Sequence, residues 1–311
     1  MSGVLIGFAT RAQVATPAPG QLSEIVIEAP EPRFVAPTRR DQIGRIWAPV
    51  MINGQGPFRL VLDTGANRSA INAHVAELLG IAPDSSRSVL LHGVTGSVAV
   101  PTVRVDSFSV GDVIVTPATL PIVIDALGGA DGVLGTEGFA GKRLYIDFHH
   151  DLITITNSHG RRAPPDFVSI ALEHSTDGLL MIAARVGGVR VHAIIDTGGQ
   201  TTIGNEAMRR ALVRRRAQGT RSEVTDVTSA TQNGETFQSP DIEVGAIEIQ
   251  GARITYGDMH IFEHWHLTKE PALLIGMDAL GLLDVFIIDY RRHELQLRTH
   301  VAWQAWRGTA K

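Results

Sequence analysis

Short apolar runs separated by Gly- and Pro-containing turns follow one another along most of this chain. Val, Ile and Thr are frequent in these runs, which favours strands over helices and predicts a mostly β protein. The run at 61–72, VLDTGANRSAIN, stands out because a lone acid lies between an apolar strand and a Gly-containing turn. Burying an unpaired carboxylate is costly, so this position needs a chemical reason.

The two halves of the chain repeat one another. Residues 53–72, NGQGPFRLVLDTGANRSAIN, align without gaps on residues 186–205, VGGVRVHAIIDTGGQTTIGN. Each segment contains a Gly-rich turn, an apolar strand, Asp-Thr-Gly, a Ser or Thr, and a closing Asn. Each Asn is a good N-cap, so we expect short helices at 73–80 and 206–219.

The later parts of the halves also correspond. SVGDVIV at 109–115 matches EVGAIEI at 243–249, and residues 131–155 match residues 272–297. Both of these longer segments contain two apolar residues and a Gly, then a hairpin with a polar turn. We therefore divide the chain into an extended Ala/Pro-rich leader (1–40), a first lobe (41–160), a second lobe (161–300) and a tail (301–311). In the leader, residues 24–28 could add an edge strand, and residues 157–167 form a linker between the lobes.

Composition excludes several classes of function. The chain has 311 residues, no Cys and a net charge of -4, so disulfides, thiolate catalysis and a global basic field for nucleic acid are excluded. No apolar run approaches the roughly 20 residues that span a bilayer. The Arg-rich stretch 209–221 is interpreted as a solvated helix face. The stretch 260–270, with three His, is interpreted as a surface loop rather than a metal site. We expect no metal and no cofactor.

Two Asp-Thr-Gly copies, each followed by an apolar pair and Gly (133–135 and 274–276), resemble the retropepsin and pepsin class of aspartic proteases. The resemblance covers roughly residues 45–298. DTGANRSAI is similar to the retroviral form, while two halves in one chain is the pepsin arrangement. The bacterial periplasmic PerP-type aspartyl proteases are the group that the chain resembles within this class. The resemblance implies a retropepsin/pepsin-like acid-protease barrel with two homologous lobes related by a pseudo-two-fold axis.

The resemblance assigns Asp63 and Asp196 as a catalytic dyad for peptide hydrolysis. Two carboxylates held close together cannot both ionise and share one proton, and aspartic proteases are the standard example of such a pair. One carboxylate can then accept a proton from water while the other polarises the carbonyl. The proton belongs to the pair, so neither residue is assigned a fixed role.

The resemblance also gives the residues around the dyad their roles. Gly65 and Gly198 permit tight turns beneath the carboxylates, Thr64 and Thr197 exchange hydrogen bonds across the axis, and Ser69 and Thr202 support the Asp carboxylates indirectly, from behind the residues that contact them. A lid is expected from two hairpins. The first has its turn at Gly93, Val94, Thr95 and Gly96, and the second at Asn233 and Gly234, a strong hairpin-turn signal.

The sequence therefore predicts an aspartic endopeptidase that acts on protein or peptide substrates. The alternative is a catalytically silent or tightly gated binding or scaffold protein on the same fold. We expect an active monomer, with a homodimer that joins like halves from two chains as the alternative. Export to the periplasm or outside the cell is expected chiefly from the resemblance, and a cytoplasmic location is the alternative.

Overall fold

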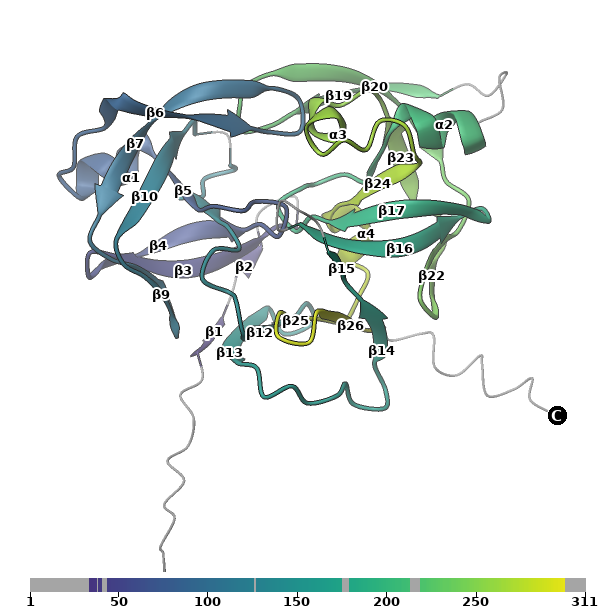
Figure 1. The fold of residues 1–311 in the computed structure, drawn as a ribbon, viewed down its shortest axis with the longest axis horizontal. Coiled ribbons are helices and arrows are strands. Elements are labelled where there is room, and N and C mark those ends of the chain that lie inside the picture. Colours follow the sequence, from purple (N-terminus) through teal and green to yellow (C-terminus); the bar gives the residue numbers. More distant parts are fainter. Residues whose placement is uncertain are drawn as a thin grey trace, which may run out of the picture. The chain divides into compact units, whose positions relative to one another are not determined.

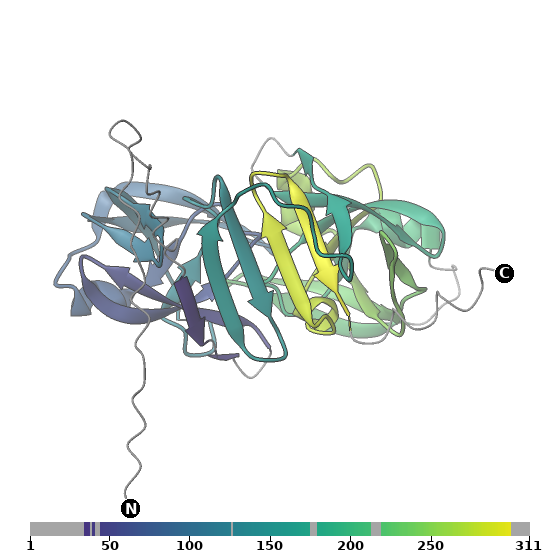
Figure 2. The same ribbon diagram turned by 90° about the horizontal axis from the view of Figure 1, so that it is seen from below.

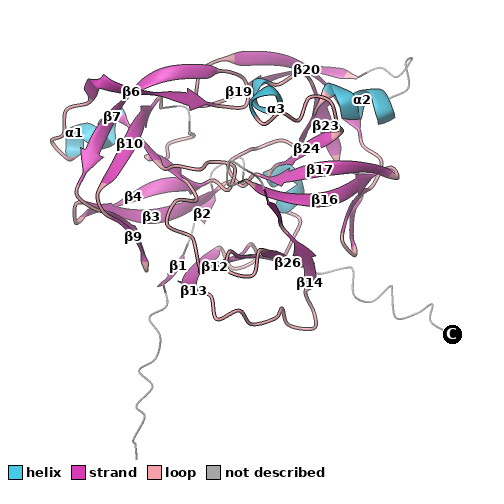
Figure 3. Ribbon diagram, in the orientation of Figure 1, coloured by secondary structure: helices cyan, strands magenta, loops and turns pink. Residues whose placement is uncertain are grey.

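The computed structural model describes residues 34–37, 39–40, 44–125, 127–174, 179–212 and 219–299, all within one compact unit, Pro32–Lys311. Strands dominate these residues, as Figure 3 shows. Residues 1–33, which include the edge strand considered at 24–28, and the predicted tail at 301–311 lie outside the described residues.

The first lobe is built on one ten-stranded sheet (Figure 1). Along the sheet the order is β6-β7-β10-β5-β11-β4-β3-β8-β9, and β2 pairs with β3. The strands are β2 (Arg39–Arg40), β3 (Ile46–Ile52), β4 (Gln55–Leu62), β5 (Ala70–Asn72), β6 (Asp84–His92), β7 (Ser97–Val105), β8 (Phe108–Val110), β9 (Val113–Val115), β10 (Ala118–Val123) and β11 (Gly132–Leu134).

The second lobe repeats this sheet strand for strand. Its order is β19-β20-β23-β18-β24-β17-β16-β21-β22, and β15 pairs with β16 as β2 pairs with β3. The strands are β15 (Glu173–His174), β16 (Leu180–Val186), β17 (Val189–Ile195), β18 (Ile203–Gly204), β19 (Thr220–Thr225), β20 (Thr231–Gln238), β21 (Ile242–Val244), β22 (Ile247–Ile249), β23 (Arg253–Tyr256) and β24 (Ala272–Ile275). The predicted mostly β, two-lobed arrangement is confirmed.

A third sheet of six strands joins the lobes (Figure 2). Its order is β1-β13-β12-β25-β26-β14, from β1 (Phe34–Pro37), β12 (Lys142–Asp147), β13 (Leu152–Asn157), β14 (Val168–Ala171), β25 (Val285–Asp289) and β26 (Glu294–Arg298). The two predicted C-terminal hairpins meet where β12 pairs with β25. There Arg143 contacts the fully buried Asp289 at 3.2 Å, so a charged pair sits at the junction.

Successive side chains along a strand point to opposite faces of the sheet, and the buried apolar residues accordingly form a main core and two smaller clusters. On β4, Leu60 and Leu62 belong to the main core, whereas Val61 belongs to a small first-lobe cluster on the other face. On β17, Ile195 belongs to the main core and Ile194 to a second-lobe cluster. The two strands that lead to the Asp residues are therefore buried on both faces, which fixes the carboxylates at their ends.

Four short helices lie in the described ranges: α1 (Ala73–Leu78), α2 (Glu206–Leu212), α3 (His260–His264) and α4 (Met277–Leu280). The predicted caps are present, because the side chain of Asn72 accepts from Val75 N at 3.0 Å and that of Asn205 accepts from Met208 N at 2.8 Å. Residues 213–218 of the second predicted helix lie outside the described residues. None of the helices described is long and apolar enough to cross a membrane.

Two local predictions are wrong. Asn233 and Gly234 do not form a hairpin turn, because both lie within β20 opposite β19, and the turn falls at 226–230. Gly234 is needed for close packing instead, since a Cβ there would lie 2.7 Å from Thr255 Cγ2. The expected surface loop at 260–270 begins with helix α3, whose residues Ile261 and Phe262 are buried.

The paired caps give a test of how the lobes differ. Asn205 also donates to the backbone oxygens of Leu267 (2.5 Å) and Glu270 (2.7 Å), whereas the side chain of Asn72 makes the cap bond alone among those observed. Asn72→Ala should cost about 1 kcal/mol of unfolding free energy. Asn205→Ala should cost about 3 kcal/mol, because it leaves several buried groups unpaired. Urea unfolding of both variants checks this, and equal losses would contradict it.

Candidate active site

The two Asp-Thr-Gly loops begin where β4 and β17 leave their sheets. Asp63 N donates to Leu134 O at 2.9 Å, and Asp196 N donates to Ile275 O at 3.1 Å. Both bonds continue a parallel pairing, β4 with β11 and β17 with β24. Each acid is thus anchored at its backbone to the apolar-apolar-Gly strand of its own lobe.

Thr64 and Thr197 lock the loops to each other. Thr64 N donates to Thr197 Oγ1 and Thr197 N donates to Thr64 Oγ1, each at 3.1 Å. Each hydroxyl in turn donates across the axis at 2.7 Å, Thr64 to Ile195 O and Thr197 to Leu62 O. Both Thr side chains are buried. These four reciprocal bonds have the geometry that the sequence predicted for the two residues.

The carboxyl groups of Asp63 and Asp196 meet between these loops and share a hydrogen bond. Gly65 N donates to Asp63 Oδ1 at 2.8 Å, and Gly198 N donates to Asp196 Oδ1 at 2.9 Å. A Cβ at Gly198 would lie 2.3 Å from Asp63 Cγ, so a side chain there would displace the opposing carboxyl. The structure therefore brings together at the acids four of the six residues that were predicted around them, Thr64, Gly65, Thr197 and Gly198.

The site favours a protonated carboxyl. Burial raises the pKa of Asp63 well above its ordinary value, and the neighbouring Asp196 raises it further. Burial also raises the pKa of Asp196, although backbone N–H donors, the bond with Asp63 and the charge of Arg45 act against this. The pair consequently retains a proton to higher pH than a solvated Asp would.

Arg45 was missed by the sequence analysis. Its side chain is buried just before β3, and its charge lowers the pKa of Asp196, whereas burial and Asp196 are the largest causes of the shift at Asp63. A single Arg ahead of a strand gives no signal by which it could have been found. Its effect makes the two acids of the dyad unequal.

The hydrogen bonds of Ser69 and Thr202 go to segments behind the Asp loops, as an indirect support of the carboxylates requires. Ser69 Oγ accepts from Gly135 N at 3.0 Å, and its own N–H donates to Glu137 at 2.6 Å. Thr202 donates from N and Oγ1 to the two oxygens of Asp278, at 3.0 and 2.6 Å. Their role is to tie each Asp loop to the segment after β11 or β24. Glu137 and Asp278 were missed because they stand 68 and 76 residues away from these partners.

Two hairpins meet above the loops. We define flap 1 as β6–β7 (84–105) and flap 2 as β19–β20 (220–238); they run along the top of Figure 1. At their tips Thr95 N donates to Asp226 Oδ2 at 2.8 Å, and Thr95 Oγ1 donates to Ala230 O at 2.7 Å. The predicted turn at Gly93–Gly96 closes with a bond from Gly93 N to Gly96 O. Asn233 and Gly234 are not at this tip.

The flap tips also cross over to the opposite lobe. Val94 of flap 1 packs against the second-lobe cluster, which contains Ile194, Ile203, Met259, Ile261, Phe262, Ala272 and Leu274. Val227 of flap 2 packs against the first-lobe cluster, which contains Val61, Ala70, Val123, Leu127, Ala130 and Val133. The first-lobe cluster includes Val61 of β4, the strand that leads to Asp63, and the second-lobe cluster includes Ile194 of β17, the strand that leads to Asp196. Apolar surface therefore flanks the dyad on both sides.

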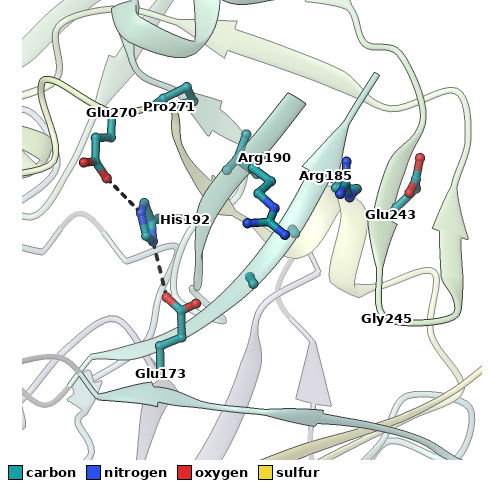
Figure 4. A pocket seen from close by; sticks show the side chains of 11 residues that line it. Glu173, Arg185, Arg190, His192, Glu243, Gly245, Glu270 and Pro271 are labelled. Atoms are coloured by element: carbon teal, nitrogen blue, oxygen red, sulfur yellow. Dashed lines mark hydrogen bonds and ion pairs between the residues drawn. The ribbon is translucent and has the colours of Figure 1, made fainter. Parts of the chain in front are cut away.

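A charged hollow of about 720 Å³ lies elsewhere on the second lobe (Figure 4). His192 stands in it between Glu270 (3.0 Å) and Glu173 (3.3 Å), and Arg185 and Arg190 complete its wall. These side chains are at least partly exposed and the histidine is already paired, so the hollow is not the reactive site. Within the described ranges, no group of three or more His, Asp or Glu residues could hold a metal ion.

A model of the aspartyl protease family matches residues 48–137 and 182–279, which is more than half of the chain. The chain belongs to the aspartyl protease family. The two matched segments contain the two Asp-Thr-Gly loops, one in each lobe. No curated protein matches the chain in a sequence search.

The Thr exchange should behave as one unit. Thr64→Val removes one donor and one acceptor and leaves Ile195 O and Thr197 N unpaired, so we expect a loss of about 2–4 kcal/mol in unfolding free energy. Thr64→Ser keeps the hydroxyl and should cost about 1 kcal/mol or less. Because Thr64 and Thr197 bond to each other and belong to one hydrogen-bond network, the double Val variant should cost less than the sum of the two single variants. Denaturant unfolding measures this cycle, and additive losses would show that the bonds act separately.

Proposed function

We propose that this protein is an aspartic endopeptidase whose dyad is Asp63 and Asp196. The observation that carries the proposal is the shared hydrogen bond between two carboxyl groups at the ends of β4 and β17, that of Asp196 buried and that of Asp63 half-buried. A structural ion pair would place a cation opposite each acid. Here the acids face each other, an arrangement that costs stability and is useful in proton transfer.

The proposed reaction needs only this pair and water. One carboxylate takes a proton from the attacking water while the other carboxyl donates its proton to the peptide carbonyl oxygen. The resulting tetrahedral diol collapses when a hydroxyl proton returns to the dyad and the leaving nitrogen gains a proton, which breaks the C–N bond. The Thr64–Thr197 bonds hold the two acids in register through both steps.

The substrate would be an extended peptide with apolar side chains on both sides of the cleaved bond. The two apolar clusters that flank the dyad supply the matching surface, and the flaps supply strand edges that can pair with a peptide backbone. For this peptide to enter, Val94 and Val227 must leave the clusters, so binding requires the flaps to open. The relation to PerP-type enzymes and the expected export remain predictions.

Cleavage of a mixed peptide library tests the proposal. Intact protein should cut internal bonds, and Asp63→Asn and Asp196→Asn should each lower the rate by about 10³-fold or more, because either change removes the shared-proton pair. Asp106→Asn, at an exposed acid between β7 and β8, is the matched control and should cut at the normal rate. Mass spectrometry of the products gives the cut sites.

Folded protein that makes no internal cuts, with the flaps shown to open, would overturn the peptidase proposal. It would favour the binding or scaffold alternative. Cuts that survive in either Asp variant would locate the activity elsewhere.

A further inference from the structure

Three histidines from the two lobes meet beside the flap tips. His92 ends β6 of flap 1, directly before the tip, and His260 and His264 lie one turn apart on α3 of the second lobe. The ring of His92 stacks on that of His264 with centroids 3.9 Å apart and on that of His260 at 5.7 Å. His92 Nδ1 is 3.3 Å from His260 Nε2, a hydrogen bond that needs at least one of the two rings to be neutral.

The same helix holds the flap tip by its backbone. Ile261 N donates to Val94 O at 3.2 Å, and the Val94 side chain packs against the cluster that contains Ile261 and Phe262. Flap 1 and α3 are therefore joined by one continuous contact. It consists of the stacked histidines, the hydrogen bond from Ile261 N to Val94 O, and the packed side chain of Val94. The flap cannot lift from the second-lobe cluster without separating the rings.

We propose that this contact is an acid-released latch: protonation of the stacked histidines repels flap 1 from α3 and opens access to the dyad. Adjacent imidazolium rings carry like charges and cannot make the His92–His260 hydrogen bond. Neutral rings allow both the bond and the stacking. The closed arrangement is thus favoured at neutral pH and weakened by acid.

The charges around the latch agree with this direction. Burial lowers the pKa of His92 below its ordinary value of 6.5, and His264 and His260 lower it further. On α3 the other charged side chain is Glu263, which is exposed; across the tip, Asp226 is bound by Thr95 N and by Thr228. Because the open flap relieves the depressed pKa, it binds more protons than the closed flap as the pH falls below 6.5.

Hydrogen exchange of single amides tests the latch without any measurement of peptide cleavage. Thr95 N and Ile261 N bridge between elements of the two lobes, so their exchange reports flap opening. In the wild-type chain their protection factors should fall by at least about threefold from about pH 7.5 to about pH 5.5. Gly93 N, which bonds to Gly96 O within flap 1, should change less.

Substitutions separate the latch from general effects of acid. His92→Gln keeps a polar, neutral side chain and should abolish the decrease in the protection factors of Thr95 N and Ile261 N between about pH 7.5 and about pH 5.5. His264→Gln is a second variant that should also reduce this decrease. His74→Gln, at an exposed histidine of α1, is the matched control and should keep the wild-type fall. An unchanged protection factor in the wild-type chain, or an equal fall in both latch variants, would overturn the latch.

The consequence of opening for catalysis rests on the proposed peptidase function. If the chain cuts peptides, His92→Gln should remove an acid-dependent gain in kcat/KM while the dyad variants remain inactive. If it cuts none, the exchange experiment still decides whether the latch exists. Failure of the latch and failure of the proposed function are therefore distinguishable.

Discussion

The structure depends on the exchange of hydrogen bonds between Thr64 and Thr197. The acids that form the dyad come from different halves of the chain, and each sits at the end of a strand that belongs to its own sheet. The Thr hydroxyls accept from the opposite loop and donate to the strand behind it, so they fix both loops in one register. Burial of these bonds excludes water as a competing partner, and the carboxyl groups are consequently forced to face each other.

The two lobes share one arrangement of strands because the chain contains an internal repeat, and they differ where the two copies of the repeat carry different residues. The ten-stranded sheets have the same strand order, and the six-stranded sheet repeats its own pattern about the β12–β25 junction. Arg45 breaks the equality of the dyad, because its charge lowers the pKa of Asp196, whereas burial and Asp196 are the largest causes of the shift at Asp63. Helix α3 breaks the equality of the flaps, because it binds flap 1 through His92 and Val94.

The repeat made much of this predictable. A gapless match over the Asp loops predicts their positions and the two caps, because these features depend on local sequence, and the family resemblance implies the Thr exchange. Gly234 was misplaced because Asn-Gly fits a turn, whereas the decisive contact is with Thr255 on a neighbouring strand. The partners of Ser69 and Thr202 were not predicted, because Glu137 and Asp278 arrive from distant segments. The contact between His92 and His260 spans 168 residues, and periodicity carries no information about such a pairing.

The central claim is that Asp63 and Asp196 hold one proton between them at a pH where solvated Asp residues are ionised. ¹³C NMR of protein labelled at aspartate Cγ measures this directly, with Asp63→Asn and Asp196→Asn spectra to assign the two signals. Because burial raises the pKa of both groups, the pair should still hold a proton at a pH where solvated Asp residues are ionised, and each variant should lose this shared behaviour. Two signals that titrate independently near the ordinary value of 3.8 would contradict the account.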